Sequence, residues 1–138
     1  MEKHISKSHD DTIKIAASFA ASLLPGSIVL LDGDLGAGKT VFSKGIVQAL
    51  SNGEISAVSP TFVIMNEYET NPKVYHFDLY RLSDVSELDA IGAEEYIYSD
   101  GISLIEWPSR VSDYFPKSAI KVNIKKANDN ERVIEIER

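Results

Sequence analysis

The first third of the chain carries a helical pattern of apolar residues, followed by a short and wholly apolar run. Apolar side chains recur at helical spacing within residues 13–24, behind Ser8 and Asp11, which have the spacing of a capping box. Pro25-Gly26 is expected to end this helix. Residues 28–31 are all apolar and are bounded by turn residues, which is typical of a parallel strand covered on both faces. We expect this run to be the central strand of a sheet.

A helix and a hairpin are predicted next. Apolar side chains lie on one helical face between residues 42 and 50, and this helix should stop near Asn52-Gly53. Two β-prone runs, residues 62–69 and 74–80, lie on either side of Asn71-Pro72. They predict an antiparallel hairpin.

The last third of the chain continues the mixture of helices and strands. Ser86 and Asp89 repeat the capping pattern and predict one short helix over residues 86–98. Residues 102–105 form a second buried-type strand, and two alternating runs within residues 119–136 predict a final antiparallel hairpin. The whole pattern indicates an α/β fold with a mixed sheet.

Length and charge narrow the classes of protein that fit. With 138 residues, 43% of them hydrophobic and 25% charged, the chain is expected to form a single domain over residues 1–138. The net charge of −7 opposes tight unaided binding to nucleic acid, which needs a basic face. Cysteine is absent, so disulfides, thiolate nucleophiles and zinc–thiolate sites are excluded.

The apolar stretch Ile15–Leu24 has about the length of a signal-peptide core. However, Asp10 and Asp11 precede it, where a signal peptide has basic residues. No apolar run reaches the length of a membrane-spanning helix. A cytoplasmic protein is therefore expected.

The most specific motif lies between the predicted central strand and the helix that follows it. The segment matches G-x-x-x-x-G-K-[ST], the P-loop, and consists of Gly33, Asp34, Leu35, Gly36, Ala37, Gly38, Lys39 and Thr40. Its glycines let backbone N–H groups converge on phosphate oxygens, the lysine adds a positive charge, and the threonine hydroxyl can ligate magnesium. The predicted fold is therefore a P-loop NTPase-like three-layer sandwich, with a central mixed, mainly parallel sheet flanked by helices.

A P-loop site also needs an acid at the end of a neighbouring strand. Asp78 and Glu106 each follow an apolar run, and both should project at the carboxyl edge of the sheet. One of the two acids could join Thr40 as a magnesium ligand while the other orients the attacking water. The residues alone do not assign these two roles.

Other candidates have an ordinary structural explanation beside a functional one. Ser59, Pro60 and Thr61 could sense the γ-phosphate or form a simple turn before a strand. His76 is expected to be a packed strand residue rather than a base. Arg81 could contact phosphate or form a surface ion pair. Trp107 could stack on a base or cover the edge of the core.

Four sequence blocks give the chain a resemblance to a known family. The blocks GDLGAGKT, SPTF, HFDLYRL and LIEWP, in this order within residues 33–108, resemble the bacterial TsaE (YjeE) family. That family is the ATPase component of tRNA threonylcarbamoyladenosine synthesis. The resemblance implies that ATP is bound with Mg²⁺, and that the protein works with TsaB and TsaD. These proteins install threonylcarbamoyl on adenosine 37 of tRNAs that read codons starting with A, so contact with tRNA would be indirect.

The resemblance also implies roles for individual residues. The loop from Gly33 to Thr40 would bind the phosphates, Thr40 and Glu106 would hold magnesium, and Asp78 would be the acid needed for hydrolysis. Ser59 to Thr61 would form a mobile switch loop. Further expected nucleotide contacts are Ser8, Thr12, Val41 and Trp107. Val41 replaces a threonine that is common in the family, so only its backbone N–H remains for such a contact.

Two other functions fit the P-loop itself. A small-molecule kinase would use the same loop to transfer the γ-phosphoryl group to an acceptor, although the chain leaves little room for an acceptor lid. A nucleotide-sensing interaction module would bind the nucleotide and hardly hydrolyse it. Acceptor-dependent product formation and measured turnover would distinguish these functions from the ATPase.

Overall fold

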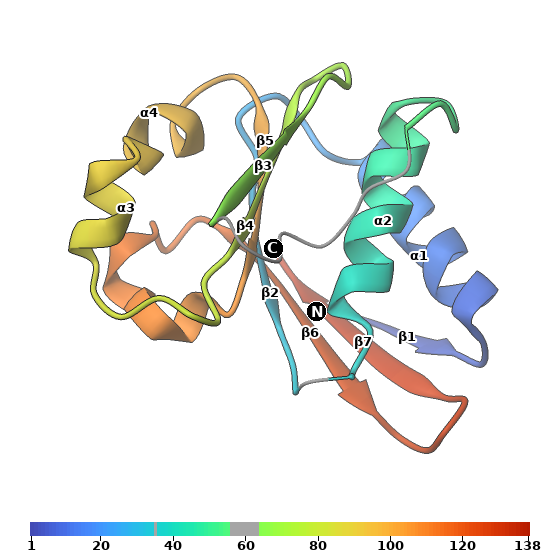
Figure 1. Cartoon of the computed structure of the whole chain (residues 1–138). Coiled ribbons are helices and arrows are strands. Elements are labelled where there is room, and N and C mark those ends of the chain that lie inside the picture. The colour runs from blue at the N-terminus through green and yellow to red at the C-terminus, as the bar shows by residue number, and fades with distance from the viewer. Residues whose placement is uncertain (35, 56–63) are drawn as a thin grey trace.

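One mixed sheet organises the molecule (Figure 1). The computed structural model describes residues 1–34, 36–55 and 64–138. The described residues form seven strands in the order β1-β7-β6-β2-β5-β4-β3. Their bounds are Glu2–Ser6 (β1), Ile28–Asp32 (β2), Met65–Tyr68 (β3), Val74–Asp78 (β4), Ile102–Glu106 (β5), Ile120–Lys126 (β6) and Arg132–Glu137 (β7).

The centre of this sheet is parallel and its margins are antiparallel. β6, β2, β5 and β4 pair in parallel, whereas β3, β7 and β1 join by antiparallel pairing. β2 is therefore the central strand and contains the predicted run of residues 28–31. β5 is buried at all five of its positions. Continuous apolar runs lie at the centre because both faces of these strands are covered.

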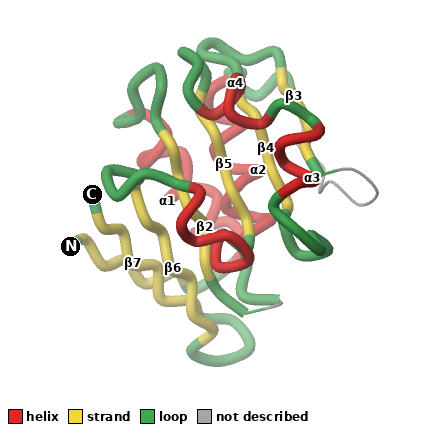
Figure 2. The backbone as a smooth tube through the Cα atoms, turned by 90° about the vertical axis from the view of Figure 1, so that its left-hand side faces the viewer, coloured by secondary structure: helices red, strands yellow, loops and turns green. Residues whose placement is uncertain are grey.

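Helices cover both faces of the sheet. α1 (His9–Ala21) and α2 (Lys39–Leu50) lie on one face, and α3 (Ser86–Ala90), α4 (Ala93–Ile97) and the 3₁₀ helix η1 (Pro108–Tyr114) lie on the other (Figures 1 and 2). β2 shows the division: Val29 and Leu31 join the apolar cluster beneath α1 and α2, whereas Ile28 joins the cluster beneath α3 and α4. The predicted sandwich of helices around a mixed sheet is confirmed.

α1 and α2 pack closely because a glycine lies between them. A Cβ atom placed on Gly45 of α2 would lie 2.6 Å from the Ala16 Cβ and 3.1 Å from the Ile13 carbonyl oxygen of α1. Only a residue without a side chain permits this approach. α2 is the helix that follows the glycine-rich loop, so its contact with α1 helps to place that loop.

The predicted cap of the first helix is confirmed. The Asp11 N–H donates to the Ser8 hydroxyl over 3.0 Å, which makes Ser8 the N-cap. The helix ends at Ala21, earlier than the predicted stop at Pro25-Gly26. The sequence reading also missed β1, residues 2–6, an edge strand held by its pairing with β7. Such a strand is stabilised by a partner distant in sequence, so its own residues carry a weak signal.

The prediction of one capped helix over residues 86–98 is wrong. Two short helices form instead, and Gly92 separates them with a left-handed φ of 69°. The Ser86 hydroxyl does not cap a helix and donates to an Asp84 carboxylate oxygen over 2.7 Å. The Ser86 hydroxyl is thus bonded to the Asp84 side chain and not to a backbone N–H of the helix, as the capping pattern required.

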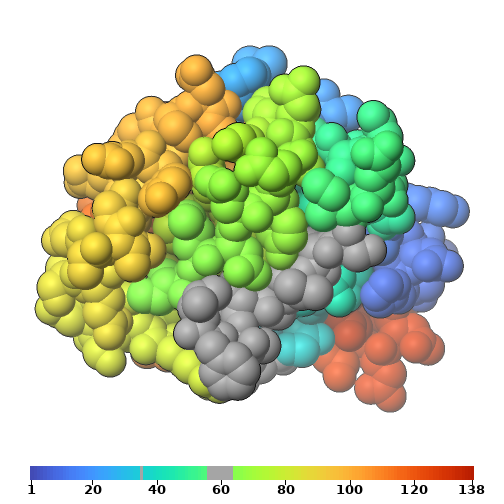
Figure 3. Space-filling view, turned by 45° about the horizontal axis from the view of Figure 1, so that its top comes forward, coloured from blue at the N-terminus to red at the C-terminus, as the bar shows by residue number. Residues whose placement is uncertain are grey.

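Both predicted hairpins are present. β3 and β4 pair antiparallel around residues 69–73, although residues 62 and 63 of the predicted first run lie outside the described part of the chain. Figure 3 shows this hairpin at the surface, between the end of α2 and the segment around α4. β6 and β7 form the last hairpin, and β6 also pairs in parallel with β2. Within the described residues, every helix is too short or too polar to cross a bilayer.

Candidate phosphate-binding site

The glycine-rich loop joins the central strand to α2 at the carboxyl edge of the parallel strands. Gly33, Gly36 and Gly38 have φ angles of 145°, 77° and 108°, a region that L-residues with side chains avoid. A Cβ on Gly33 would also collide with the Ile124 carbonyl oxygen of β6. α2 begins directly after Gly38, at Lys39. The loop therefore depends on these glycines for its path, and it brings the N-terminus of a 12-residue helix to the sheet edge.

A cavity of about 330 Å³ lies at this edge and gathers eight of the predicted site residues. Its described lining is Gly36, Gly38, Lys39, Thr40, Val41, Asp78, Tyr80, Glu106 and Trp107. The loop thus shares one cavity with both predicted acids. Tyr80 is an addition that sequence reasoning missed.

The sheet register explains why the two acids meet. Asp78 ends β4 and Glu106 ends β5, and these two residues are register partners in the parallel pair. Glu106 is also the register partner of Leu31 on β2, two residues before the loop begins. Parallel strands end at the same edge, so acids separated by 28 positions in the sequence lie side by side.

Glu106 has a partner that the sequence did not reveal. His76 lies on β4 and is 1% exposed, which agrees with the expected packed strand residue. Its Nε2 is hydrogen-bonded to the Glu106 Oε2, while its Nδ1 has no partner among the described residues. Glu106 itself is 3% exposed. One available signal was the two-residue spacing of His76 and Asp78, which places both side chains on the same face of β4.

Burial makes charge costly for Asp78. It raises the pKa of the Asp78 carboxyl, and the neighbouring Glu106 charge raises it further. A hydrogen bond from the Tyr80 N–H to the Asp78 Oδ1, 3.0 Å long, acts in the opposite direction by stabilising the carboxylate. Asp78 therefore holds a proton more readily than a carboxyl in water does.

The Lys39 side chain is buried and contacts the loop and Trp107. It is 5% exposed, and burial lowers the pKa of its ammonium group, although Glu106, Asp32 and other nearby carboxylates oppose that shift. The Nζ atom donates to the Gly33 carbonyl oxygen over 2.5 Å and lies 3.3 Å from the centre of the Trp107 ring. The lysine is thus held at the loop, over the indole, by a hydrogen bond and a cation–π contact.

Trp107 both covers the edge of the core and lines the cavity. It is half-buried against the apolar cluster beneath α3 and α4. Its backbone has a left-handed φ of 59°, unusual for a residue with a side chain. The ring also packs against Tyr80, with 4.9 Å between ring centres. Arg81 is exposed and is not part of the described lining.

Several predicted nucleotide contacts lie elsewhere. The Ser8 hydroxyl caps α1, and the buried Thr12 hydroxyl lies 2.7 Å from the Ser6 hydroxyl. Neither residue belongs to the described lining of the cavity. Gly33, Asp34 and Ala37 shape the loop beside the lining, for example through the 3.0 Å bond from the Ala37 N–H to the Asp34 carbonyl. Leu35, Ser59, Pro60 and Thr61 lie outside the described residues.

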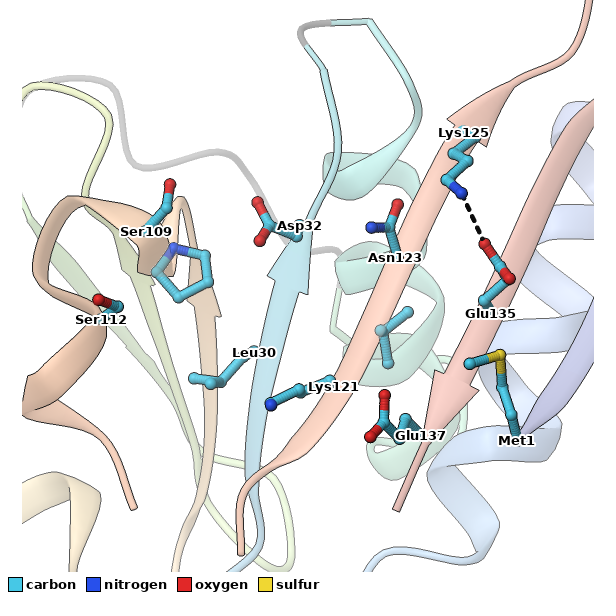
Figure 4. Close-up of a pocket in the computed structure, with 12 residues that line it drawn as sticks. Met1, Leu30, Asp32, Ser109, Ser112, Lys121, Asn123, Lys125, Glu135 and Glu137 are labelled. Atoms are coloured by element: carbon cyan, nitrogen blue, oxygen red, sulfur yellow. Dashed lines mark ion pairs between the residues drawn. The ribbon is translucent and has the colours of Figure 1, made fainter. Parts of the chain in front are cut away.

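A larger hollow of about 540 Å³ lies beside η1, over strands β2, β6 and β7 (Figure 4). It is lined by side chains of both charges from β2, β6 and β7, including the Lys125–Glu135 ion pair at 3.0 Å. None of the predicted site residues lines it among the described residues. The predicted site residues therefore gather at the smaller cavity and not at this hollow.

Comparison with known proteins agrees with this arrangement. The family model for "Threonylcarbamoyl adenosine biosynthesis protein TsaE" matches residues 6–134. The TsaE protein of Rickettsia bellii is 40% identical over 133 residues, covering 96% of this chain and 92% of that protein. The TsaE protein of Bacillus subtilis is 40% identical over 126 residues, covering 91% and 78%.

A solved structure extends the agreement to three dimensions. The crystal structure of Bacillus subtilis YdiB superposes with a TM-score of 0.79 at 34% identity, and the match covers 96% of this chain and 82% of that one. The model match, the identities and the shared fold span nearly the whole sequence. The chain therefore belongs to the TsaE family of threonylcarbamoyl adenosine biosynthesis proteins.

Proposed function

We propose that this chain binds ATP with Mg²⁺ and hydrolyses ATP during the synthesis of threonylcarbamoyladenosine in tRNA. The observation that carries the proposal is the convergence in one cavity of a P-loop, its lysine and two carboxylates from adjacent strands. Membership of the TsaE family supports the same function.

The loop and the start of α2 would bind the phosphates. Backbone N–H groups from Gly36 to Thr40 would donate to phosphate oxygens, and the positive end of the α2 dipole would favour their negative charge. Lys39 now donates to a neutral carbonyl. A phosphate oxygen would offer it a charged and therefore stronger acceptor.

The oxygen donors of the cavity fit Mg²⁺. The Thr40 hydroxyl and the Glu106 carboxylate would hold the ion, with Asp78 close enough in the same lining to share its water shell. No group of three or more His, Cys, Asp or Glu side chains in the described part of the chain could hold a metal alone. Mg²⁺ accepts such a site because it retains waters and takes substrate phosphates as ligands. When bound, it would neutralise charge on the β- and γ-phosphates.

Asp78 would orient the attacking water and accept its proton. Its raised pKa makes it a better proton acceptor than an exposed aspartate. His76 would hold one oxygen of the Glu106 carboxylate and leave the rest of the group facing the cavity. The switch role of Ser59 to Thr61 is part of the proposal through the family resemblance alone.

The same resemblance names TsaB and TsaD as partners. The net charge of −7 supports a subunit that binds proteins and meets tRNA only through them. Because these partners modify tRNA, the proposed place of action is the cytoplasm.

The test is ATP turnover in the complex reconstituted with TsaB and TsaD. Asp78→Asn and Glu106→Gln should each lower kcat by about 100-fold or more, as for the loss of other charge-stabilising groups. Glu95→Gln is the matched control, because Glu95 is an exposed acid on α4, away from the cavity, and should leave kcat unchanged. Full turnover in both site variants would refute the proposal.

The same assay distinguishes the other two functions. Phosphate release without an added acceptor supports hydrolysis. ADP formation that requires a small-molecule acceptor would indicate a kinase. Nucleotide binding without turnover in the complex would indicate a sensing module.

A further inference from the structure

An arginine from the last strand contacts the P-loop from outside the cavity. Arg132 begins β7, yet its Nε donates to the Ala37 carbonyl oxygen over 3.0 Å and its Nη2 to the Gly36 carbonyl oxygen over 3.4 Å. These contacts join residues 95 and 96 positions apart. The arginine is not part of the cavity lining, so the proposed reaction does not use it directly.

The other side of the guanidinium is fixed by the turn of its own hairpin. Nη1 donates to the carbonyl oxygens of Asn128 and Glu131 over 2.9 and 3.1 Å. The turn is itself braced, because the Asn128 Oδ1 accepts the N–H groups of Asn130 and Glu131 over 3.0 and 2.9 Å. The guanidinium therefore links a braced turn to the loop, and its planar fork suits several acceptors at once.

These bonds determine where the peptide groups of the loop point. In a trans peptide the C=O and the following N–H point in opposite directions. Because the Ala37 carbonyl points at Arg132, the Gly38 N–H points away from it, and Gly38 lines the cavity. Gly38 and Gly36 also have left-handed φ angles, which glycine adopts freely, so other peptide orientations are accessible to the loop without a brace.

We propose that Arg132 is a positioning residue for nucleotide binding: it holds the Gly36 and Ala37 carbonyls away from the cavity so that the Gly38 N–H faces the phosphates. This inference rests on the proposed nucleotide function. A carbonyl oxygen turned toward the phosphates would repel them. A loop without the Arg132 contacts would also lose more conformational entropy when the nucleotide binds, which weakens binding. Arg132 therefore acts before the nucleotide arrives.

Charge alone is a competing explanation. Arg132 forms no ion pair with any described carboxylate, so its charge could attract a nucleotide from a distance. Arg132→Lys keeps the charge but loses the fork that reaches two carbonyls and the turn together. Arg132→Gln loses both the charge and the fork. Comparing the two variants separates geometry from charge.

The experiment measures the Kd of MgADP by isothermal titration calorimetry on the full chain. We expect both Arg132 variants to bind MgADP about ten-fold more weakly, the effect of losing a charge-assisted hydrogen bond. Lys125→Gln is the control, because it removes one positive charge from the adjacent strand, where the one ion-pair partner of Lys125 among the described residues is Glu135. It should bind as the original chain does.

In the complex with TsaB and TsaD, the KM for ATP should rise about ten-fold in the Arg132 variants, with kcat at saturation within about two-fold of the original. A purely structural defect would instead lower the melting temperature of the nucleotide-free chain and leave the KM of the folded fraction unchanged, which would overturn the inference. Normal binding by Arg132→Lys would also overturn it in favour of charge. If the original chain does not bind MgADP, the proposed function fails as well. If it binds and both variants match it, only the positioning role fails.

Discussion

The buried pair between His76 and Glu106 leads to a prediction that can be worked out from the structure. We consider His76→Leu, which introduces an apolar side chain of similar size and removes the partner of Glu106. The two residues are 1% and 3% exposed, so the hydrogen bond between them is shielded from bulk water. The variant leaves a buried carboxyl group without its hydrogen-bond partner.

The expected cost follows from two opposing effects. Removing the partner of a buried carboxylate leaves its charge uncompensated, which costs about 3–5 kcal/mol of unfolding free energy. The substitution also removes the His76 Nδ1, which has no partner among the described residues and whose burial costs about 1 kcal/mol. The free energy of unfolding should therefore fall by about 2–4 kcal/mol, which lowers the melting temperature of a chain this size by about 10 °C.

Urea unfolding of four proteins tests this reasoning as a double-mutant cycle. The four are the original chain, His76→Leu, Glu106→Gln and the double variant. Because the neutral amide of Glu106→Gln needs no charged partner, His76→Leu should cost much less in that background. His76→Gln should recover part of the stability, since its amide N–H can donate to the carboxylate.

Two results would refute the argument. The first is a loss below about 0.5 kcal/mol for His76→Leu, the level of an ordinary surface substitution. The second is an equal loss in both backgrounds, which would mean that the two residues do not interact energetically. Either result would remove the reason to assign His76 a role in holding Glu106.

Two further predictions concern the fold and its pH dependence. Gly45→Ala should lower the free energy of unfolding by about 1–3 kcal/mol, because its Cβ would lie 2.6 Å from that of Ala16. Urea denaturation measures this change. An unchanged free energy of unfolding would show that α1 and α2 move apart at little cost. Burial, with Glu94 and Asp89 nearby, raises the pKa of the Tyr114 hydroxyl above its usual 10.0. The native state then holds this proton where the unfolded chain has released it, so stability is complete below about pH 10 and falls as pH rises further. Tyr114→Phe should lose less stability than the original chain between pH 9 and 11 in thermal melts; parallel curves would contradict this.

Local patterns in the sequence determined the central strands, the helix after the loop and the phosphate-binding motif. Residues 28–31 and 102–105 are apolar throughout because both faces of the central strands are covered, and this signal is contained in each segment alone. The loop glycines are equally local, since their positive φ angles belong to a single turn. The Ser8 cap was readable for the same reason, as its hydrogen bond spans three residues.

Contacts between distant segments required the tertiary structure. The strand order brought Asp78 beside Glu106, and sequence reasoning could reach this only as an expectation about strand ends. Nothing local to His76 identifies Glu106 as its partner, 30 positions away, and nothing local to Arg132 identifies the loop carbonyls. The edge strand β1 was missed for the same reason, because its pairing partner β7 is distant in the sequence. Short-range patterns record the conformational preference of a segment, whereas pairings across the sheet depend on which strands become neighbours, and that is decided only when the whole chain folds.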